Sequence, residues 1–326
     1  MEKEKIIQEC QKQNGSVLSF PDRGPWGSNA YRGNCSGYIH AFLIWKYKVQ
    51  KLAELFAGSG TGYDVAKDMG ISYIGADLNP NPVRPGILTV DAIQDEVPDA
   101  FYDADFLFQH PPYGKEIGIP YAGSMYEDVT GELAKSDLGQ MDWDTFIKTL
   151  NHVTMKYYAA MAPGSRMGIL MGDVRKNGCF YSMLKDIVKP GETEQIIIKM
   201  QHNAMSNRGK DLSRIGNGKN PFVPLLHEYI LILKKIGPYM LHFEYPVKKD
   251  LDIRDSHSCT WKDVVYGVLR SIGRSASLSE IYKEIEDHQK AKTNPHWKEK
   301  VRQVLQHLQH NGMVNHTGYG IWSLAA

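Results

Sequence analysis

Short apolar segments alternate with helical segments between about residue 50 and residue 171, and this alternation limits the possible folds most strongly. The expected strands are 51–57, 73–78, 87–91, 105–110 and 166–171, and the expected helices include 62–69 and 142–161. Strands that are separated by helices run parallel, with helices covering both faces of the sheet. Two later strands, 195–200 and 227–233, have a polar loop between them instead of a helix. We therefore predict an α/β fold whose parallel sheet ends in an antiparallel strand.

A second unit follows this sheet. Residues 241–258 have mixed charge and no periodicity, which predicts a linker between a first domain of residues 1–240 and a second of residues 259–326. The second domain is expected to contain helices at 260–271, 278–288 and 296–310. A hairpin of 313–316 and 320–324 follows, turned through residues 317–319. This order of elements resembles a winged helix, a small α+β domain.

The third helix of this second unit has a polar face that suits DNA. Arginine and glutamine are side chains that read base edges in the major groove. Residues 256–324 hold nine Lys and Arg against six Asp and Glu, so the unit is locally basic. The residues expected to contact DNA are Lys298, Arg302, Gln303, Gln306 and, at the hairpin tip, Tyr319. A winged helix that binds a protein partner is the alternative.

A glycine-rich turn follows the first predicted strand, in the segment LAELFAGSGTG. Its glycines allow a ligand to approach the backbone closely. The next two strands end at Asp77 and Asp91. Because the carboxyl ends of parallel strands form the ligand edge of such folds, we expect these loops to converge on one cofactor site. Two alternatives stay open here: the acids only cap turns, or the ligand is NAD, although the GxGxxG spacing of NAD sites is absent.

The fourth strand runs directly into His110, Pro111, Pro112 and Tyr113. Two consecutive prolines fix the turn and supply no N–H donors. The turn therefore presents a carbonyl acceptor and an aromatic ring at the sheet edge. Methylation of an exocyclic amino group needs such acceptors, because the nitrogen lone pair is delocalised into the base. The tyrosine ring would stack on a base flipped out of the duplex.

These motifs resemble those of the amino-methylating DNA methyltransferases, which carry an FxGxG cofactor loop and a [D/N/S]PPY catalytic loop. The chain is more narrowly similar to a branch with HPPY, with GNCSG before the cofactor loop and with GDxRK after the fifth strand. Here these are His110–Tyr113, Gly33–Gly37 and Gly172–Lys176. The similarity covers Trp26 to Leu233, in the γ-type order. It implies a Rossmann-like S-adenosylmethionine-dependent methyltransferase sheet.

The resemblance also implies roles for individual residues. His110, Pro111, Pro112 and Tyr113 would be catalytic. Residues around S-adenosyl-L-methionine would be Asn34, Cys35, Phe56, Ala57, Gly58, Gly60, Thr61, Asp77, Leu78, Asp91 and Ala92. Among them, Asp77 would bind the ribose, Asp91 the adenine end, and Asn34 or Cys35 the methionine tail. His110 departs from the usual Asp, Asn or Ser; a neutral imidazole accepts one hydrogen bond, and the alternative is a histidine that only packs or caps the strand.

A polar loop between the last two strands of the sheet is the expected contact with the target. It contains Arg208, Lys210, Arg214 and Lys219, and its basic, glycine-rich composition suits phosphate contact. A merely solvated loop is the alternative. In GDVRK, Asp173 and Arg175 could also form an internal salt bridge. His227 and Glu228, at the start of the last strand, are interpreted as structural.

The most favoured function is methylation of adenine N6 in double-stranded DNA, with any restriction endonuclease expected on a separate chain. The alternatives are cytosine-N4 methylation, an RNA amino methyltransferase, and a DNA-binding protein with a degenerate catalytic domain. Four scattered cysteines give neither a disulfide framework nor a thiolate metal site. With no signal peptide and no apolar run of the ~18 residues that a membrane span needs, we expect a soluble, cytoplasmic protein.

Overall fold

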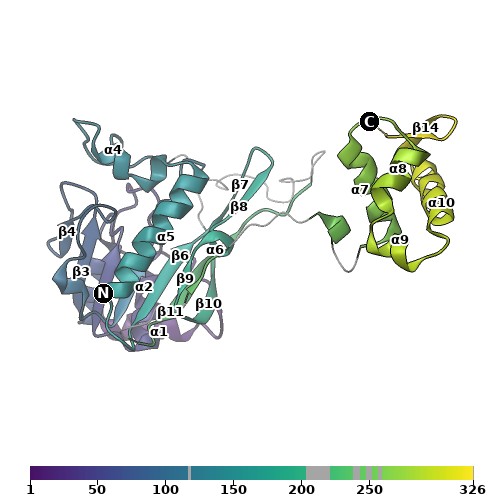
Figure 1. Ribbon diagram of the computed structural model, residues 1–326. Coiled ribbons are helices and arrows are strands. Elements are labelled where there is room, and N and C mark those ends of the chain that lie inside the picture. Colours follow the sequence, from purple (N-terminus) through teal and green to yellow (C-terminus); the bar gives the residue numbers. More distant parts are fainter. Residues whose placement is uncertain (117–118, 203–220, 238–242, 247–251, 256–258, 326) are drawn as a thin grey trace. The chain divides into compact units, whose positions relative to one another are not determined.

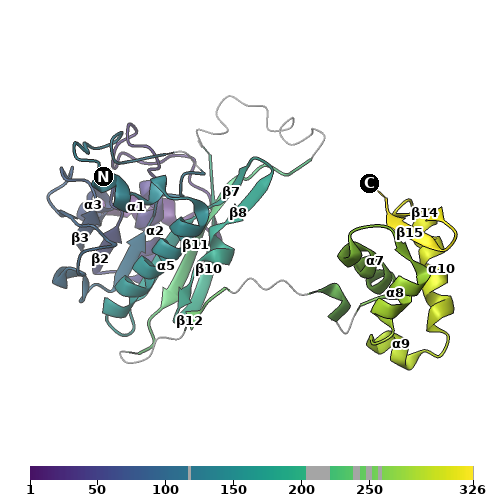
Figure 2. The same ribbon diagram turned by 45° about the horizontal axis from the view of Figure 1, so that its top comes forward.

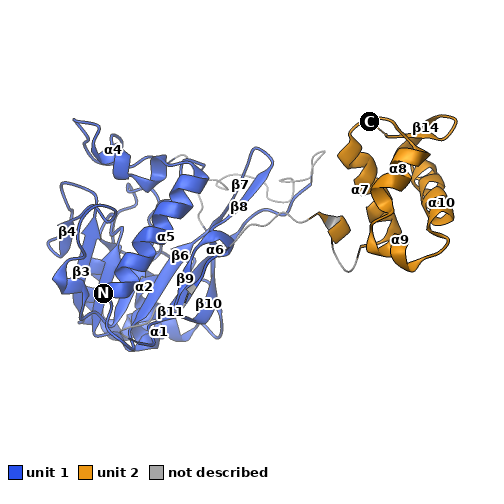
Figure 3. Ribbon diagram, viewed as in Figure 1, with its two compact units in different colours: residues 1–246 blue, residues 247–326 orange. Residues whose placement is uncertain are grey.

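The computed structural model of the chain describes all residues except 117–118, 203–220, 238–242, 247–251, 256–258 and 326 (Figure 1). Its residues fall into two compact units, Met1–Pro246 and Val247–Ala326 (Figure 3). The glycine-rich turn of residues 56–62, called the glycine loop below, and the HPPY loop of His110–Tyr113 both lie in the first unit. Among the described residues, no helix is long and apolar enough to cross a membrane.

An eight-stranded sheet forms the first unit, in the order β1-β10-β11-β6-β5-β2-β3-β4. The strands are β1 Val17–Leu18, β2 Lys51–Leu55, β3 Ser72–Asp77, β4 Ile87–Thr89, β5 Phe106–Gln109, β6 Arg166–Met171, β10 Glu192–Met200 and β11 His227–Lys234. Only β11 is antiparallel to its neighbours. From β2 the chain moves outward to β3 and β4, then crosses to β5 and β6, which is doubly wound order with its switch point between β2 and β5. The predicted Rossmann-like α/β fold is confirmed, and so is the antiparallel strand.

Helices cover both faces of this sheet. Helices α1 (Lys3–Gln11), α2 (Gly37–Tyr47) and α3 (Thr61–Met69) pack in one core cluster with Phe106 and Phe108 of β5. Helix α5 (Trp143–Ala160) covers the opposite face, where its buried side chains meet Leu107 (Figure 2). Successive residues of β5 thus point to opposite faces, as the strand period of two requires. Both faces are apolar, which explains the nearly continuous apolar strands of the sequence.

Several shorter elements of the first unit were not predicted from the sequence. Helix α2 has no polar stripe, because residues 37–44 are all buried. The hairpin of β7 (Asp173–Lys176) and β8 (Cys179–Ser182) follows β6 directly. Helix α1 and strand β1, near the start of the chain, were not predicted either. The remaining ones are η1 Asp99–Phe101, α4 Leu133–Ser136, η2 Leu138–Gln140, α6 Met183–Asp186, β9 Lys189–Pro190 and β12 Phe243–Glu244.

The second unit holds the three predicted helices and the hairpin. Its elements are η3 Ile253–Asp255, α7 Trp261–Ile272, β13 Ala276–Ser277, α8 Leu278–Ile285, α9 Gln289–Thr293, α10 Trp297–His310, β14 Val314–Gly318 and β15 Ile321–Leu324. The strands form a sheet in the order β13-β15-β14. Two details of the prediction were wrong. Helix α8 ends three residues early and α9 follows it, and the hairpin turns at Tyr319-Gly320 because Thr317 and Gly318 continue β14.

Candidate active site

The turn after β2 has an unusual backbone. Phe56 has φ +59°, which is rare for a bulky side chain and is found mostly where function requires it. Gly58 and Gly60 also have positive φ. A Cβ on Gly58 would lie 2.9 Å from the ring of Tyr31, so a larger residue there would displace this tyrosine. The glycine at this position therefore allows the Tyr31 ring to pack directly on the turn.

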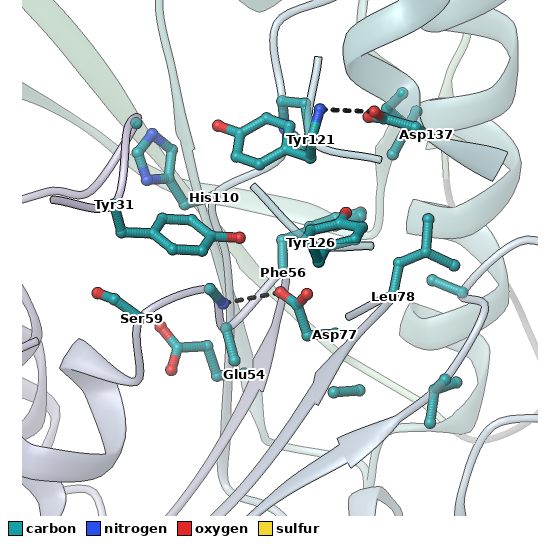
Figure 4. Close-up of a pocket in the computed structure, with 18 of the residues that line it drawn as sticks. Tyr31, Glu54, Phe56, Ser59, Asp77, Leu78, His110, Tyr121, Tyr126 and Asp137 are labelled. Carbon is teal, nitrogen blue, oxygen red and sulfur yellow. Dashed lines mark hydrogen bonds between the residues drawn. The ribbon is translucent and has the colours of Figure 1, made fainter. Parts of the chain in front are cut away.

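The acids at the ends of β3 and β4 organise the loops around this turn. The buried Asp77 carboxylate accepts hydrogen bonds from the N–H groups of Gly58 (2.7 Å) and Asn79 (2.9 Å) (Figure 4). Burial raises the pKa of Asp77, and these hydrogen bonds oppose the rise. Asp91 accepts from the N–H of Ile93 (2.9 Å) and from the Ser136 hydroxyl. Both acids thus cap turns, as the structural alternative expected, and both also face a pocket.

That pocket lies at the carboxyl edge of the sheet and encloses about 840 Å³ of empty space, its open mouth included. The predicted cofactor residues that line it are Asn34, Cys35, Phe56, Ala57, Gly58, Thr61, Asp77, Leu78, Asp91 and Ala92. Gly60 is the exception, since it caps α3 and a Cβ there would meet Arg84.

The HPPY loop adjoins the same pocket. His110 and Pro112 line it, whereas Pro111 is buried. The ring of Tyr113 packs on Gly172, where a Cβ would lie 3.0 Å from a ring carbon. The hydroxyl of Tyr113 lies 3.2 Å from His110 Nε2. The glycine loop and the HPPY loop thus meet at one cavity.

Tyr113 is also bound from the antiparallel end of the sheet. Its hydroxyl donates to Glu228 Oε1 at 2.9 Å, and Glu228 pairs with Lys199 at 2.5 Å. Burial would raise the pKa of Glu228, but Lys199 and His110 outweigh it and lower the pKa to about 2. The interpretation of Glu228 as merely structural was therefore incomplete. No spacing in the sequence places β11 beside the HPPY loop, because that contact arises from sheet order.

Three tyrosines cover the glycine loop, and none was predicted. Tyr31, Tyr121 and Tyr126 line the pocket, with ring centroids 5.9 Å apart for the first pair and 6.4 Å for the second. The backbone N–H of Tyr121 donates to buried Asp137 at 2.7 Å (Figure 4). Because these residues come from irregular loops, no periodic pattern in the sequence marks them.

A buried polar chain supports the pocket wall on the side of Cys35. The Cys35 sulfur lies 3.9 Å from His40 Nδ1, and His40 Nε2 lies 2.6 Å from Glu54 Oε1. Glu54 also accepts from the Tyr73 hydroxyl at 2.5 Å. Burial opposes ionisation of Cys35, but His40 and His110 prevail and lower its pKa to about 6. Glu54 and His40 were not predicted, although Glu54 stands only two residues before Phe56.

The GDVRK segment forms strand β7 rather than an internal ion pair. Arg175 stacks on Phe180 (5.7 Å) and Phe222 (5.0 Å), and Asp173 accepts from the Tyr229 hydroxyl at 3.3 Å. Among the described residues no Asp173–Arg175 salt bridge occurs, so that alternative was wrong. The loop residues expected to contact DNA, Arg208, Lys210, Arg214 and Lys219, lie outside the described residues.

The residues expected to contact DNA in the second unit are exposed. Lys298 lies over the Trp297 and Tyr282 rings, and Arg302 donates to the Tyr282 hydroxyl and to Glu299. Gln303 accepts from Lys300. Gln306 shares the exposed face of α10, and the Tyr319 side chain is fully exposed. The other face is buried through Val301, Val304, Leu305 and Leu308.

Comparison with known proteins gives distant fold neighbours. No protein-family profile and no curated protein matches the sequence. Solved structures that are similar include TrmN from Thermus thermophilus, with 17% identity and a TM-score of 0.35. The match covers 63% of this chain and 50% of TrmN. NodS from Bradyrhizobium japonicum, an N-methyltransferase in complex with S-adenosylhomocysteine, has 11% identity and a TM-score of 0.32. The match covers 97% of its length and 72% of this chain. A Burkholderia thailandensis 1,6-didemethyltoxoflavin-N1-methyltransferase has 11% identity and a TM-score of 0.32, and the match covers 76% of its length and 61% of this chain. These values reflect a distant likeness.

Proposed function

We propose that the protein is an S-adenosylmethionine-dependent methyltransferase that modifies an exocyclic amino group of a base in double-stranded DNA, most favourably adenine N6. One observation carries this proposal: the glycine loop with Asp77 and the HPPY residues His110 and Pro112 line the same pocket. A cofactor site and an amino-group acceptor site in one cavity are the two parts that such a transfer needs. NAD chemistry would give no role to the HPPY loop.

The cofactor fits the residues present. Gly58 and Asp77 both line the pocket, and the Asp77 carboxylate stands where ribose hydroxyls would donate. When bound, S-adenosylmethionine supplies an electrophilic methyl group on its sulfonium. The pocket carboxylates of Asp77 and Asp91 lie near the ends of adjacent strands β3 and β4. We assign the ribose to Asp77, the adenine end to Asp91, and the methionine tail to Asn34 or Cys35.

The chain's own residues would activate the amino group. The Pro111 carbonyl and the His110 imidazole accept its two hydrogens and draw the nitrogen lone pair out of conjugation with the base. Tyr113 stacks on the flipped base and holds it in place. The alternative is that His110 serves only to hold Tyr113, with which it is in contact at 3.2 Å, and that Pro111 acts alone.

Duplex DNA is favoured as substrate by the second unit. Exposed Arg302, Gln303 and Gln306 lie on one face of α10, and an exposed tyrosine stands at the hairpin turn, as in a winged helix that enters the major groove. Cytosine N4 remains the runner-up base, because the HPPY chemistry serves both amino groups. RNA methylation and DNA binding without catalysis are two further candidate functions. A restriction endonuclease would be a separate partner chain.

Radiolabelled methyl transfer tests this proposal. The protein is incubated with methyl-labelled S-adenosylmethionine and either duplex DNA, single-stranded RNA or no acceptor. We expect label in duplex DNA only, and loss of that label with Pro112→Ala. Label in RNA alone would reject the substrate. Absence of label from every acceptor, together with DNA binding, would support the inactive DNA-binding protein.

A further inference from the structure

The Tyr113 hydroxyl stands between two polar partners but has a single hydrogen to donate. It lies 2.9 Å from Glu228 Oε1 and 3.2 Å from His110 Nε2. An ionised carboxylate only accepts hydrogen bonds. The Lys199 ammonium pairs with Glu228 at 2.5 Å and lowers the pKa of its carboxyl despite burial, so Glu228 is ionised at neutral pH. Burial and Glu228 also raise the pKa of Tyr113 well above its ordinary value, so the hydroxyl keeps its hydrogen and donates it to Glu228.

This assignment determines which nitrogen of His110 carries a proton. Because the hydroxyl hydrogen points to Glu228, the Tyr113 oxygen can only accept from His110 Nε2. A neutral imidazole with hydrogen on Nε2 has its lone pair on Nδ1. We infer that Glu228 is a positioning residue that, through Tyr113, holds His110 in the Nε2–H tautomer and leaves the Nδ1 lone pair as the acceptor for the target amino hydrogen. Cys35 is a further hydrogen-bond partner of His110, so the amino group competes with its sulfur for this ring. The inference rests on the proposed function, since it deepens the role given to His110.

The fold is built to keep this carboxylate charged. Glu228 and Lys199 are directly paired residues of neighbouring strands β11 and β10, and Glu228 is only 6% exposed. Strand β6 flanks β11 on the side away from β10, and Gly172 directly follows β6. This glycine leaves room for Tyr113 and Glu228, because a Cβ there would lie 3.0 Å from the Tyr113 ring and 3.3 Å from Glu228 Cγ. Lys199 thus keeps the Glu228 carboxylate negatively charged behind the HPPY loop, and neither residue lines the pocket.

Glu228→Gln separates the charge from the shape of the side chain. The amide oxygen is the better partner for the Lys199 ammonium, which turns the amide NH₂ toward Tyr113. The Tyr113 oxygen must then accept from Gln, and its hydroxyl donates to His110 Nε2. The imidazole hydrogen moves to Nδ1, where it opposes the amino group instead of accepting from it.

Nitrogen NMR of the ¹⁵N-histidine-labelled full chain tests this, with the His110 signal assigned by its loss in His110→Ala. We expect the Nε2–H tautomer in the wild type and the Nδ1–H tautomer in Glu228→Gln. We also expect kcat to fall about 10²-fold or more, the scale for a wrongly held catalytic imidazole, with cofactor Kd and DNA KM unchanged. Glu194→Gln, which removes a charge paired with Arg166 on the same sheet, is the matched control and should change neither the His110 tautomer nor kcat.

Tyr113→Phe provides a second route that leaves Glu228 and Lys199 intact. It should remove the tautomer preference, and combined with Glu228→Gln it should cause no further loss of kcat. A wild-type Nδ1–H tautomer, or an unchanged tautomer in both variants, would overturn the inference. Because the NMR signal needs no turnover, it decides the inference even if the wild type methylates no DNA, an outcome that would reject the proposed function alone.

Discussion

At the scale of single residues, Asp77 joins local structure to the proposed cofactor site. Its carboxylate holds the N–H groups of Gly58 and Asn79 and faces the pocket. Asp77→Ala should therefore weaken S-adenosylmethionine binding by about 1–3 kcal/mol, the cost of leaving polar groups without a partner. Asp103→Ala, an exposed acid paired with Lys51, is the control and should bind normally. Calorimetry would contradict the assignment if both variants kept wild-type affinity, or if NAD bound instead.

Glu228 gives the stability of the first unit a pH dependence. Lys199, His110 and Tyr113 face its carboxylate, and its pKa falls from the usual 4.5 to about 2. A lowered pKa in the folded state stabilises the fold above pH 4.5, and this contribution is lost as the pH falls toward 2. We expect it to be on the order of 3 kcal/mol. Urea unfolding should show wild type and Glu228→Gln differing at pH 7, with the difference shrinking as the pH falls from 4.5 to 2; a gap that is independent of pH would contradict the prediction.

At the scale of elements, α10 is the expected reading helix. Arg302 is exposed but held by Tyr282 and Glu299, so it must exchange these partners to reach a base. Arg302→Ala should cost about 1–3 kcal/mol on the recognised site and little on unrelated DNA, if it contacts a guanine edge. Arg270→Ala, an exposed cation on α7, controls for lost charge. Equal losses on all sequences would show that Arg302 contacts only phosphate.

Elements with a clear period were predictable from sequence, and those without one were not. Helix α5 shows its buried stripe at helical spacing, and it was predicted to within one residue at each end. Helix α2 is apolar almost all round, so its sequence shows no alternation of apolar and polar residues at helical spacing. Asp77, Asp91 and the HPPY residues were predictable because they follow predicted strands, whereas Asn34 and Cys35 came from the resemblance to the methyltransferase motifs. Tyr121, Tyr126 and Glu228 reach the site through loop paths and sheet order, which no local pattern records.

At the scale of the whole molecule, each unit has its own core. The core clusters of the sheet contain only residues before 247, and the cluster of the second unit begins at Cys259, as far as the described residues go. Removal of residues 247–326 should therefore leave a folded protein that binds S-adenosylmethionine. DNA affinity should fall, and its salt dependence should flatten as phosphate contacts are lost. Equal affinities and slopes for both lengths would assign the second unit to a protein partner.

The central claim is that the pocket transfers a methyl group to an exocyclic amino group of a DNA base. Mass spectrometry of nucleosides from duplex DNA, treated with the full chain and S-adenosylmethionine, measures this directly. The account predicts N6-methyladenine, absent when Tyr113→Ala replaces the wild type even though that variant still binds the cofactor. N4-methylcytosine alone would correct the base and leave the chemistry standing. DNA in which neither base is methylated, or is methylated at ring carbon only, would contradict the account.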